Sequence, residues 1–236
     1  MPRILLRIMN ILCIETSTNI CSAALCADGK PISERVSVAE ANHAGLLPVY
    51  VESLLSYARE SGHSIEAVAI SEGPGSYTGL RIGASLAKGL CYGMNIPLIP
   101  VPTLQVLSAA ALSRLEGKEN LLLCPMLDAR RMEVYTALYD THLNLQGDVE
   151  ARVVENNDWL AESGKEVFFF GNGAAKCESV LASETIHFLP DILPLASFMG
   201  CLAEQKKGLQ GPESAYWSPF YLKEFMAAQS HVKGLK

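Results

Sequence analysis

The sequence predicts an α/β fold of two lobes, each a mixed β-sheet with flanking helices. Two observations carry this prediction. In the first half, three short apolar strands are followed by helices that alternate with single strands, and after a polar break at 117–120 the same order begins again. Strands joined by tight turns pair antiparallel, whereas strands joined through helices pair parallel, so each half should form one mixed sheet covered by helices. At 49% hydrophobic residues, the 236-residue chain has ample material for such cores.

The first half opens with three strands. Apolar runs occupy 11–14 and 20–26, and Asp28-Gly29 before the alternating run 32–38 is a strong hairpin signal. The elements that follow alternate between helical periodicity and short apolar runs, which predicts crossover connections. They are a helix at 42–59, a strand at 68–71, a helix at 78–92, a strand at 97–101 and a helix at 104–115.

The second half repeats this plan. Placing Glu15 over Asp128 also aligns the strands that follow each residue, which indicates an internal repeat of a strand-strand-strand-helix unit. Its predicted elements are strands at 121–127, 132–139 and 149–154, a helix from about residue 158, a strand at 167–170 and a helix ending at Leu181.

A glycine-rich loop organises the first half. Gly73-Pro74-Gly75 ends the strand 68–71, and Ser76 or Thr78 can cap the next helix, whose free N–H groups could hold an anion or a partner's carboxylate. The spacing matches neither a dinucleotide fingerprint nor a phosphate loop nor a hydrolase elbow, so a tight turn that needs glycine is the simpler interpretation.

Inside that helix, Gly79, Gly83 and Ala87 recur at every fourth residue. Each interior glycine costs about 1 kcal/mol relative to alanine, so we expect the close approach of another helix to offset the cost.

Composition excludes several classes. A net charge of −6 and a pI near 5.4 argue against a dominant nucleic-acid surface. Seven cysteines without a Cys-x-x-Cys pair indicate free, mostly buried thiols in a reducing compartment. The start of the chain makes a poor signal peptide and no run of 18 apolar residues occurs, so we expect a cytoplasmic protein without a membrane span. None of the five histidines forms a pair with metal-ligand spacing, and no local motif identifies a catalytic residue.

Two such lobes resemble the actin-like ATPase superfamily (RNase H-like fold), which includes acetate and sugar kinases, heat-shock chaperones and actin. The resemblance implies an ATP cleft between two β-hairpins, but here neither hairpin turn contains glycine, so ATP or ADP binding is expected only weakly or in a complex. A small-molecule kinase or ATPase of this fold is the alternative function, and a metallopeptidase-like hydrolase is a weaker one. The candidate cleft residues are Glu15, Ser17, Asp128, Arg130, Gly171 and Gly173.

The helix 42–59 carries an apolar stripe, Leu47, Val51 and Leu54, which Tyr50 widens. That is broader than one buried face requires. Either this helix and the helix 78–92 simply cover their own sheet, or they form a surface for a helix pair of a partner.

Several segments resemble the TsaB (YeaZ) family of bacterial tRNA-modification proteins, and Ser71–Gly83 (SEGPGSYTGLRIG) resembles its hallmark. The resemblance implies a non-catalytic partner of TsaD, the enzyme that transfers threonylcarbamoyl to adenosine 37 of ANN-decoding tRNAs, with the ATPase TsaE as a third component. It further implies a homodimer in isolation and contact with tRNA only through the complex. The other matching segments are 11–18, 42–43, 128–135 and 219–223.

The same resemblance assigns regions of this chain. It implies an N-terminal lobe of 9–104 completed by 214–228, a C-terminal lobe of 105–213, and residues 1–8 as an extension or a misassigned start. The metal-binding His-x-x-x-His of TsaD corresponds to Thr103 and Leu107, so no metal site is expected. The helix surface becomes the predicted partner interface. Its candidate residues are Leu47, Tyr50, Val51, Leu54, Tyr77, Arg81, Ile82 and Ser85.

Overall fold

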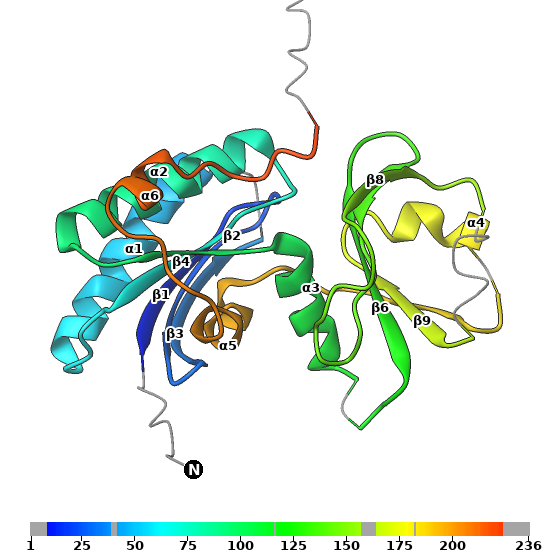
Figure 1. Ribbon diagram of the computed structural model, residues 1–236, viewed down its shortest axis with the longest axis horizontal. Helices are drawn as coiled ribbons and strands as arrows, with labels where there is room; N and C mark the ends of the chain where they lie inside the picture. Colours follow the sequence, from blue (N-terminus) through cyan, green and yellow to red (C-terminus); the bar gives the residue numbers. More distant parts are fainter. Residues whose placement is uncertain (1–8, 39–41, 116, 157–163, 182, 224–236) are drawn as a thin grey trace, which may run out of the picture.

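The computed structural model describes residues 9–38, 42–115, 117–156, 164–181 and 183–223, which form two five-stranded sheets placed side by side (Figure 1). The N-terminal sheet has the order β3-β2-β1-β4-β5. Its first three strands pair antiparallel, and β4 and β5 join parallel to β1. Asp28 and Gly29, both at positive φ, form the predicted hairpin turn. The strands are β1 (Asn10–Glu15), β2 (Cys21–Ala27), β3 (Lys30–Ser37), β4 (Ala67–Ser71) and β5 (Leu98–Val101).

The C-terminal sheet has the equivalent order, β10-β9-β6-β7-β8, with the same senses of pairing. This confirms the predicted duplication. The fifth strand, β10, was not predicted, and the predicted strand 132–139 ends at Thr136, beyond which Tyr139 forms only a bridge with Leu123. The helix predicted from about residue 158 lies outside the described residues. The strands are β6 (Leu121–Asp128), β7 (Glu133–Thr136), β8 (Glu150–Val153), β9 (Glu166–Phe170) and β10 (Ile186–Leu189).

Two long helices, α1 (His43–Glu60) and α2 (Tyr77–Met94), cover the outer face of the N-terminal sheet (Figure 1). Asn42 caps α1 by accepting a hydrogen bond from the Gly45 amide at 3.2 Å. Ser76 caps α2 in the same way through the Gly79 amide, also at 3.2 Å, which decides between the two predicted caps. The apolar stripe of α1 meets Leu12, Ile14, Val68 and Ile70 of the sheet.

The other face of the N-terminal sheet is covered by a late segment of the chain, η3 (Ala196–Phe198) and α5 (Gly200–Glu204). The Ala196 amide donates to Ser22 Oγ at 2.9 Å, and Leu209 forms a bridge with Leu98. The chain therefore returns to the N-terminal sheet near Ala196 rather than at residue 214. After this return, α6 (Pro212–Tyr216) lies along α2 (Figure 1).

Between the two sheets lies α3 (Thr103–Leu112), whose leucines join the core of the C-terminal sheet (Figure 1). The opposite face of that sheet is covered by η2 (Ala175–Cys177) and α4 (Glu178–Leu181). All seven cysteines are free thiols, and six of them are buried, as the sequence predicted.

Candidate functional site

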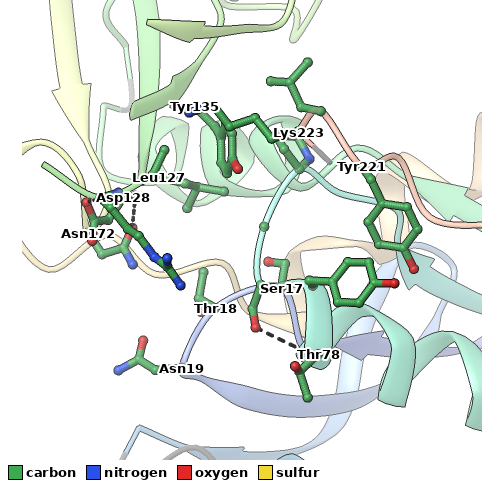
Figure 2. Close-up of a pocket in the computed structure, with 18 of the residues that line it drawn as sticks. Ser17, Thr18, Asn19, Thr78, Leu127, Asp128, Tyr135, Asn172, Tyr221 and Lys223 are labelled. Carbon is green, nitrogen blue, oxygen red and sulfur yellow. Dashed lines mark hydrogen bonds between the residues drawn. The ribbon is translucent and has the colours of Figure 1, made fainter. Parts of the chain in front are cut away.

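A cleft of about 1210 Å³ lies between the lobes, where the first hairpin turns of the two sheets face each other. Figure 2 shows Ser17, Thr18 and Asn19 on one wall and Asp128 and Asn172 on the other. The turns that follow β1 and β6 thus line the cleft from opposite sides, and most of the side chains that they contribute are polar.

Glu15 ends β1 beneath this cleft and is fully buried. The Ser17 amide donates to Glu15 Oε1 at 2.6 Å, whereas no atom among the described residues hydrogen-bonds to Oε2. Burial in an apolar environment disfavours the charged form, and it raises the pKa of the Glu15 carboxyl to about 7. Glu15 therefore lies under the floor of the cleft and does not line it.

The glycines of the loop and of α2 are explained by the β1–β2 turn. A Cβ at Gly75 would overlap the carbonyl of Ser17, and a Cβ at Gly79 or Gly83 would overlap atoms of Thr16. The Ser76 amide also donates to the Ser17 carbonyl at 2.6 Å. The prediction that a second helix approaches this seam is therefore wrong, because the hairpin turn of the same lobe occupies it.

Across the cleft, Asp128 is exposed and paired. Its Oδ1 accepts from the Arg130 amide at 3.2 Å and forms an ion pair with Lys176, which also donates to the Glu133 carbonyl at 2.7 Å. Arg130 and Arg131 follow with φ of 74° and 47°, in the left-handed region where glycine is usual. The turn therefore keeps a glycine-like backbone while presenting two arginine side chains to the cleft.

The two glycines after β9 serve packing. A Cβ at Gly171 would lie 2.5 Å from the carbonyl oxygen of Met126, and one at Gly173 would lie 2.9 Å from the carbonyl carbon of Leu127. These glycines let their loop approach the end of β6, and Asn172 between them lines the cleft and accepts from the Asp128 amide at 3.0 Å. Of the six candidate cleft residues, Ser17, Asp128 and Arg130 line the cleft, whereas Glu15, Gly171 and Gly173 support it from behind.

A segment that the sequence did not place at the site spans the cleft. We call residues 219–223 the strap. The Phe220 amide donates to the Glu72 carbonyl at 2.6 Å, and the Tyr221 ring lies 4.8 Å from the ring of Tyr77, so the strap is attached to the N-terminal lobe. At its end, Lys223 forms an ion pair with Glu133 of the C-terminal lobe. The strap thus connects the two lobes. Figure 2 shows Tyr221 and Lys223 among the side chains that line the cleft.

Thr103 and Leu107, for which the family resemblance suggested a correspondence to metal ligands, are part of the core. Thr103 is buried, and its hydroxyl accepts from the Gly73 amide at 3.1 Å. Leu107 is buried against the C-terminal sheet. Among the residues that the structure describes, no three His, Cys, Asp or Glu side chains are grouped as a metal site would require. Within the same residues, no helix is long and apolar enough to cross a membrane.

The outer face of α1 and α2 carries the second candidate site. Leu47, Val51 and Leu54 of the predicted interface are buried in the core of their own lobe. Tyr50, Tyr77 and Ile82 are partly buried, and Arg81 and Ser85 are exposed. A shallow groove runs between the two helices. The groove is lined by Ala44, Leu47, Pro48, Arg81, Ile82, Ser85 and Leu86.

Two sheets of equivalent topology, with a cleft between their first hairpin turns, define the two-lobed actin-like ATPase fold. Residues 37–201 match the family model of TsaD, described as tRNA N6-adenosine threonylcarbamoyltransferase.

The chain is 32% identical over 203 residues to the tRNA threonylcarbamoyladenosine biosynthesis protein TsaB of Bacillus subtilis. The aligned region covers 83% of this chain and 82% of the relative. It is 37% identical over 136 residues to TsaB of Escherichia coli, covering 58% and 57% of the two chains. The structure of YeaZ from Pseudomonas aeruginosa superposes with a TM-score of 0.74 at 27% identity, covering 91% of this chain and 100% of that one. The chain belongs to the TsaB (YeaZ) family.

Proposed function

We propose that this chain is the non-catalytic partner of TsaD in the synthesis of N6-threonylcarbamoyladenosine at position 37 of ANN-decoding tRNAs in the cytoplasm. The names of the B. subtilis and E. coli relatives support the pathway, and the match to the TsaD model supports a common origin with the transferase. In this proposal the chain supplies a docking surface, and TsaD supplies the chemistry. TsaE is the third component, and a homodimer forms when TsaD is absent.

The observation that carries the non-catalytic role is the packing at the start of α3. Thr103 holds the glycine-rich loop through Gly73, and Leu107 fills the core between α3 and the C-terminal sheet. Leucine has no atom that can bind a metal ion, and a threonine hydroxyl is not among the Cys, His and carboxylate ligands that form such sites. The lobe keeps the framework of the transferase with core residues at the ligand positions.

The docking surface in this proposal is the rim of the α1–α2 groove. Ile82 lies at its centre, half-buried, with the exposed Arg81 and Ser85 beside it. A helix pair from TsaD laid across this rim would bury roughly 1,600 Å² in total if the interface is of ordinary size. The central apolar residue should then carry a large share of the binding energy.

The proposal is tested by reconstituting tRNA modification with TsaD and TsaE, with and without this chain. We expect modified tRNA only when the chain is present, and none from the chain alone. Product formed without the chain, or by the chain alone, would refute the non-catalytic partner role.

Ile82→Glu tests the docking surface. A carboxylate at the centre of an apolar interface has no partner there, so we expect at least a hundredfold weaker association with TsaD in analytical ultracentrifugation. Leu145→Glu places the same charge at an exposed position of the C-terminal lobe and should bind like wild type. Wild-type association of Ile82→Glu would show that TsaD binds elsewhere.

A small-molecule kinase or ATPase of the same fold is the second candidate, and the open cleft between the hairpin turns is the observation in its favour. Calorimetric titration of the isolated chain with Mg-ATP distinguishes the two functions. Micromolar binding with turnover would favour the kinase.

A further inference from the structure

The cleft rim carries cations that nothing within the described chain neutralises. Asp128 is paired with Lys176, and Glu133 with Lys223. Arg130 and Arg131 are exposed, and no ion pair within the described residues involves either one. In each of these pairs the charge of the acid offsets the charge of the lysine. The two arginines therefore decide the sign of the electrostatic potential at the rim.

Aromatic side chains lie along the same cleft. Phe220 is 45% exposed and Tyr221 37%. Tyr221 lies against Tyr77, and the guanidinium of Arg81 lies 5.4 Å from the centre of the Tyr77 ring. Exposed aromatic rings beside arginines are the combination by which proteins bind single-stranded nucleic acid, since bases stack on the rings and the phosphates pair with the cations.

The opposite wall also suits a phosphate. Ser17 is 1% exposed, lines the cleft, and its hydroxyl has no partner within the described residues. The start of α2 lies beside it, where the free amides of a helix favour a negative charge. Anion-binding groups therefore face each other across the cleft from both lobes.

Three features disfavour a mononucleotide enclosed between the hairpins. The Ser17 amide, which could cradle a phosphate, is used by Glu15, and Glu15 itself is a buried acid under the floor. The positions where Gly171 and Gly173 lack a Cβ are occupied by the backbone of β6, so these glycines serve packing within the lobe. The two arginines and the exposed rings come from different lobes and line the same cleft, so an extended strand that passes along it can contact both.

From this arrangement we propose that the rim of the interlobe cleft binds single-stranded RNA directly, with Arg130 and Arg131 on its phosphates and Tyr221 stacking a base. This rests on the proposed function, because the RNA is then the loop of the tRNA that the assembled complex modifies. The chain contributes to holding the substrate as well as to docking TsaD.

The test uses the complex reconstituted with TsaD and a fluorescein-labelled anticodon stem-loop of an ANN-decoding tRNA, followed by fluorescence anisotropy at several salt concentrations. Arg130→Gln/Arg131→Gln should bind roughly tenfold more weakly, and the slope of log K against log salt should fall by about 1.4, since each phosphate contact to a single strand contributes about 0.7. Lys30→Gln/Lys207→Gln removes the same charge from exposed positions outside the cleft and should leave affinity and slope unchanged.

Tyr221→Leu separates stacking from charge. It should weaken binding at least about fivefold with the salt slope unchanged, and Tyr221→Phe should restore the affinity. Wild-type affinity and salt slope in Arg130→Gln/Arg131→Gln would overturn the proposal. It would also be overturned if ATP displaced the RNA at the concentration expected from the dissociation constant of ATP for the cleft. If the chain does not bind TsaD at all, the proposed function is refuted. If the variants associate with TsaD and support modification normally, and their RNA binding is also unaltered, only the present inference is refuted.

Discussion

Glu15 in the N-terminal lobe and Asp128 in the C-terminal lobe both end the first strand of their sheet, and the two sheets have the same strand order. Their surroundings differ. Glu15 is fully buried with one oxygen unpaired within the described residues, whereas Asp128 is exposed and forms an ion pair with Lys176. Equivalent topology has placed one acid under the cleft and the other at its edge.

The cause of this difference is the element that follows the fourth strand of each sheet. In the N-terminal lobe, the long helix α2 begins with glycines that let it lie directly on the turn after β1. In the C-terminal lobe, the loop at 171–173 packs on the end of β6 and leads only to the short η2 and α4. The duplicated sheet is thus a common framework, and the closing element decides which turn can meet a ligand.

The largest effect should come from Gly79→Ala, because the new Cβ would overlap the Thr16 carbonyl, which is backbone and cannot move aside cheaply. We expect the free energy of unfolding to fall by about 3 kcal/mol in urea denaturation. Gly93→Ala in the same helix meets no atom within 4 Å and should instead gain about 0.5–1 kcal/mol. Equal effects of the two substitutions would contradict the close packing of α2 on the turn.

Glu15→Gln tests the buried acid through pH. The pKa of Glu15 is raised from 4.5 to about 7, so the folded state holds the proton more tightly than the unfolded state. The stability that this group contributes is complete below pH 4.5 and is lost as pH rises through 7, a change of about 3 kcal/mol.

Urea denaturation of wild type and Glu15→Gln from pH 5 to 8 measures this loss. Glutamine can keep the bond from the Ser17 amide but carries no charge, so the variant should be more stable than wild type at pH 8 and nearly equal at pH 5. A wild-type pH dependence in the variant would show that another group causes it.

The strap should contribute a smaller effect. Lys223→Glu replaces the ion pair with Glu133 by a repulsion between the lobes, and we expect a loss of about 1 kcal/mol in thermal unfolding. The exchange Lys223→Glu/Glu133→Lys restores opposite charges and should recover most of it. Without recovery in the double variant, the strap would not depend on this pair.

Asp128→Asn should have the smallest effect. The residue is exposed and its ion pair is screened by solvent, so we expect a loss below about 1 kcal/mol. The amide oxygen can still accept from the Arg130 amide. This variant should also keep the wild-type pH dependence between pH 5 and 8, which makes it the matched control for Glu15→Gln.

The sequence by itself determined the strands of both sheets except β10, the helix start at Asn42, the Asp28-Gly29 hairpin and the duplication, and it narrowed the cap of α2 to Ser76 or Thr78. These features depend on alternation, caps and turns, whose signals lie within a few residues of one another. The hairpin turns were expected to form the walls of a cleft because the actin-like superfamily that the chain resembles has its cleft there.

Only the tertiary structure decided the rest. The seam of Gly79 and Gly83 receives Thr16 rather than another helix, and Lys223 reaches Glu133 over 90 residues of chain. The stripe of Leu47, Val51 and Leu54 is buried in its own lobe, although its spacing alone would suit a partner equally well. Such contacts join residues that are far apart in the chain. The periodicity of a helix indicates that one face is apolar, but it does not indicate which element covers that face.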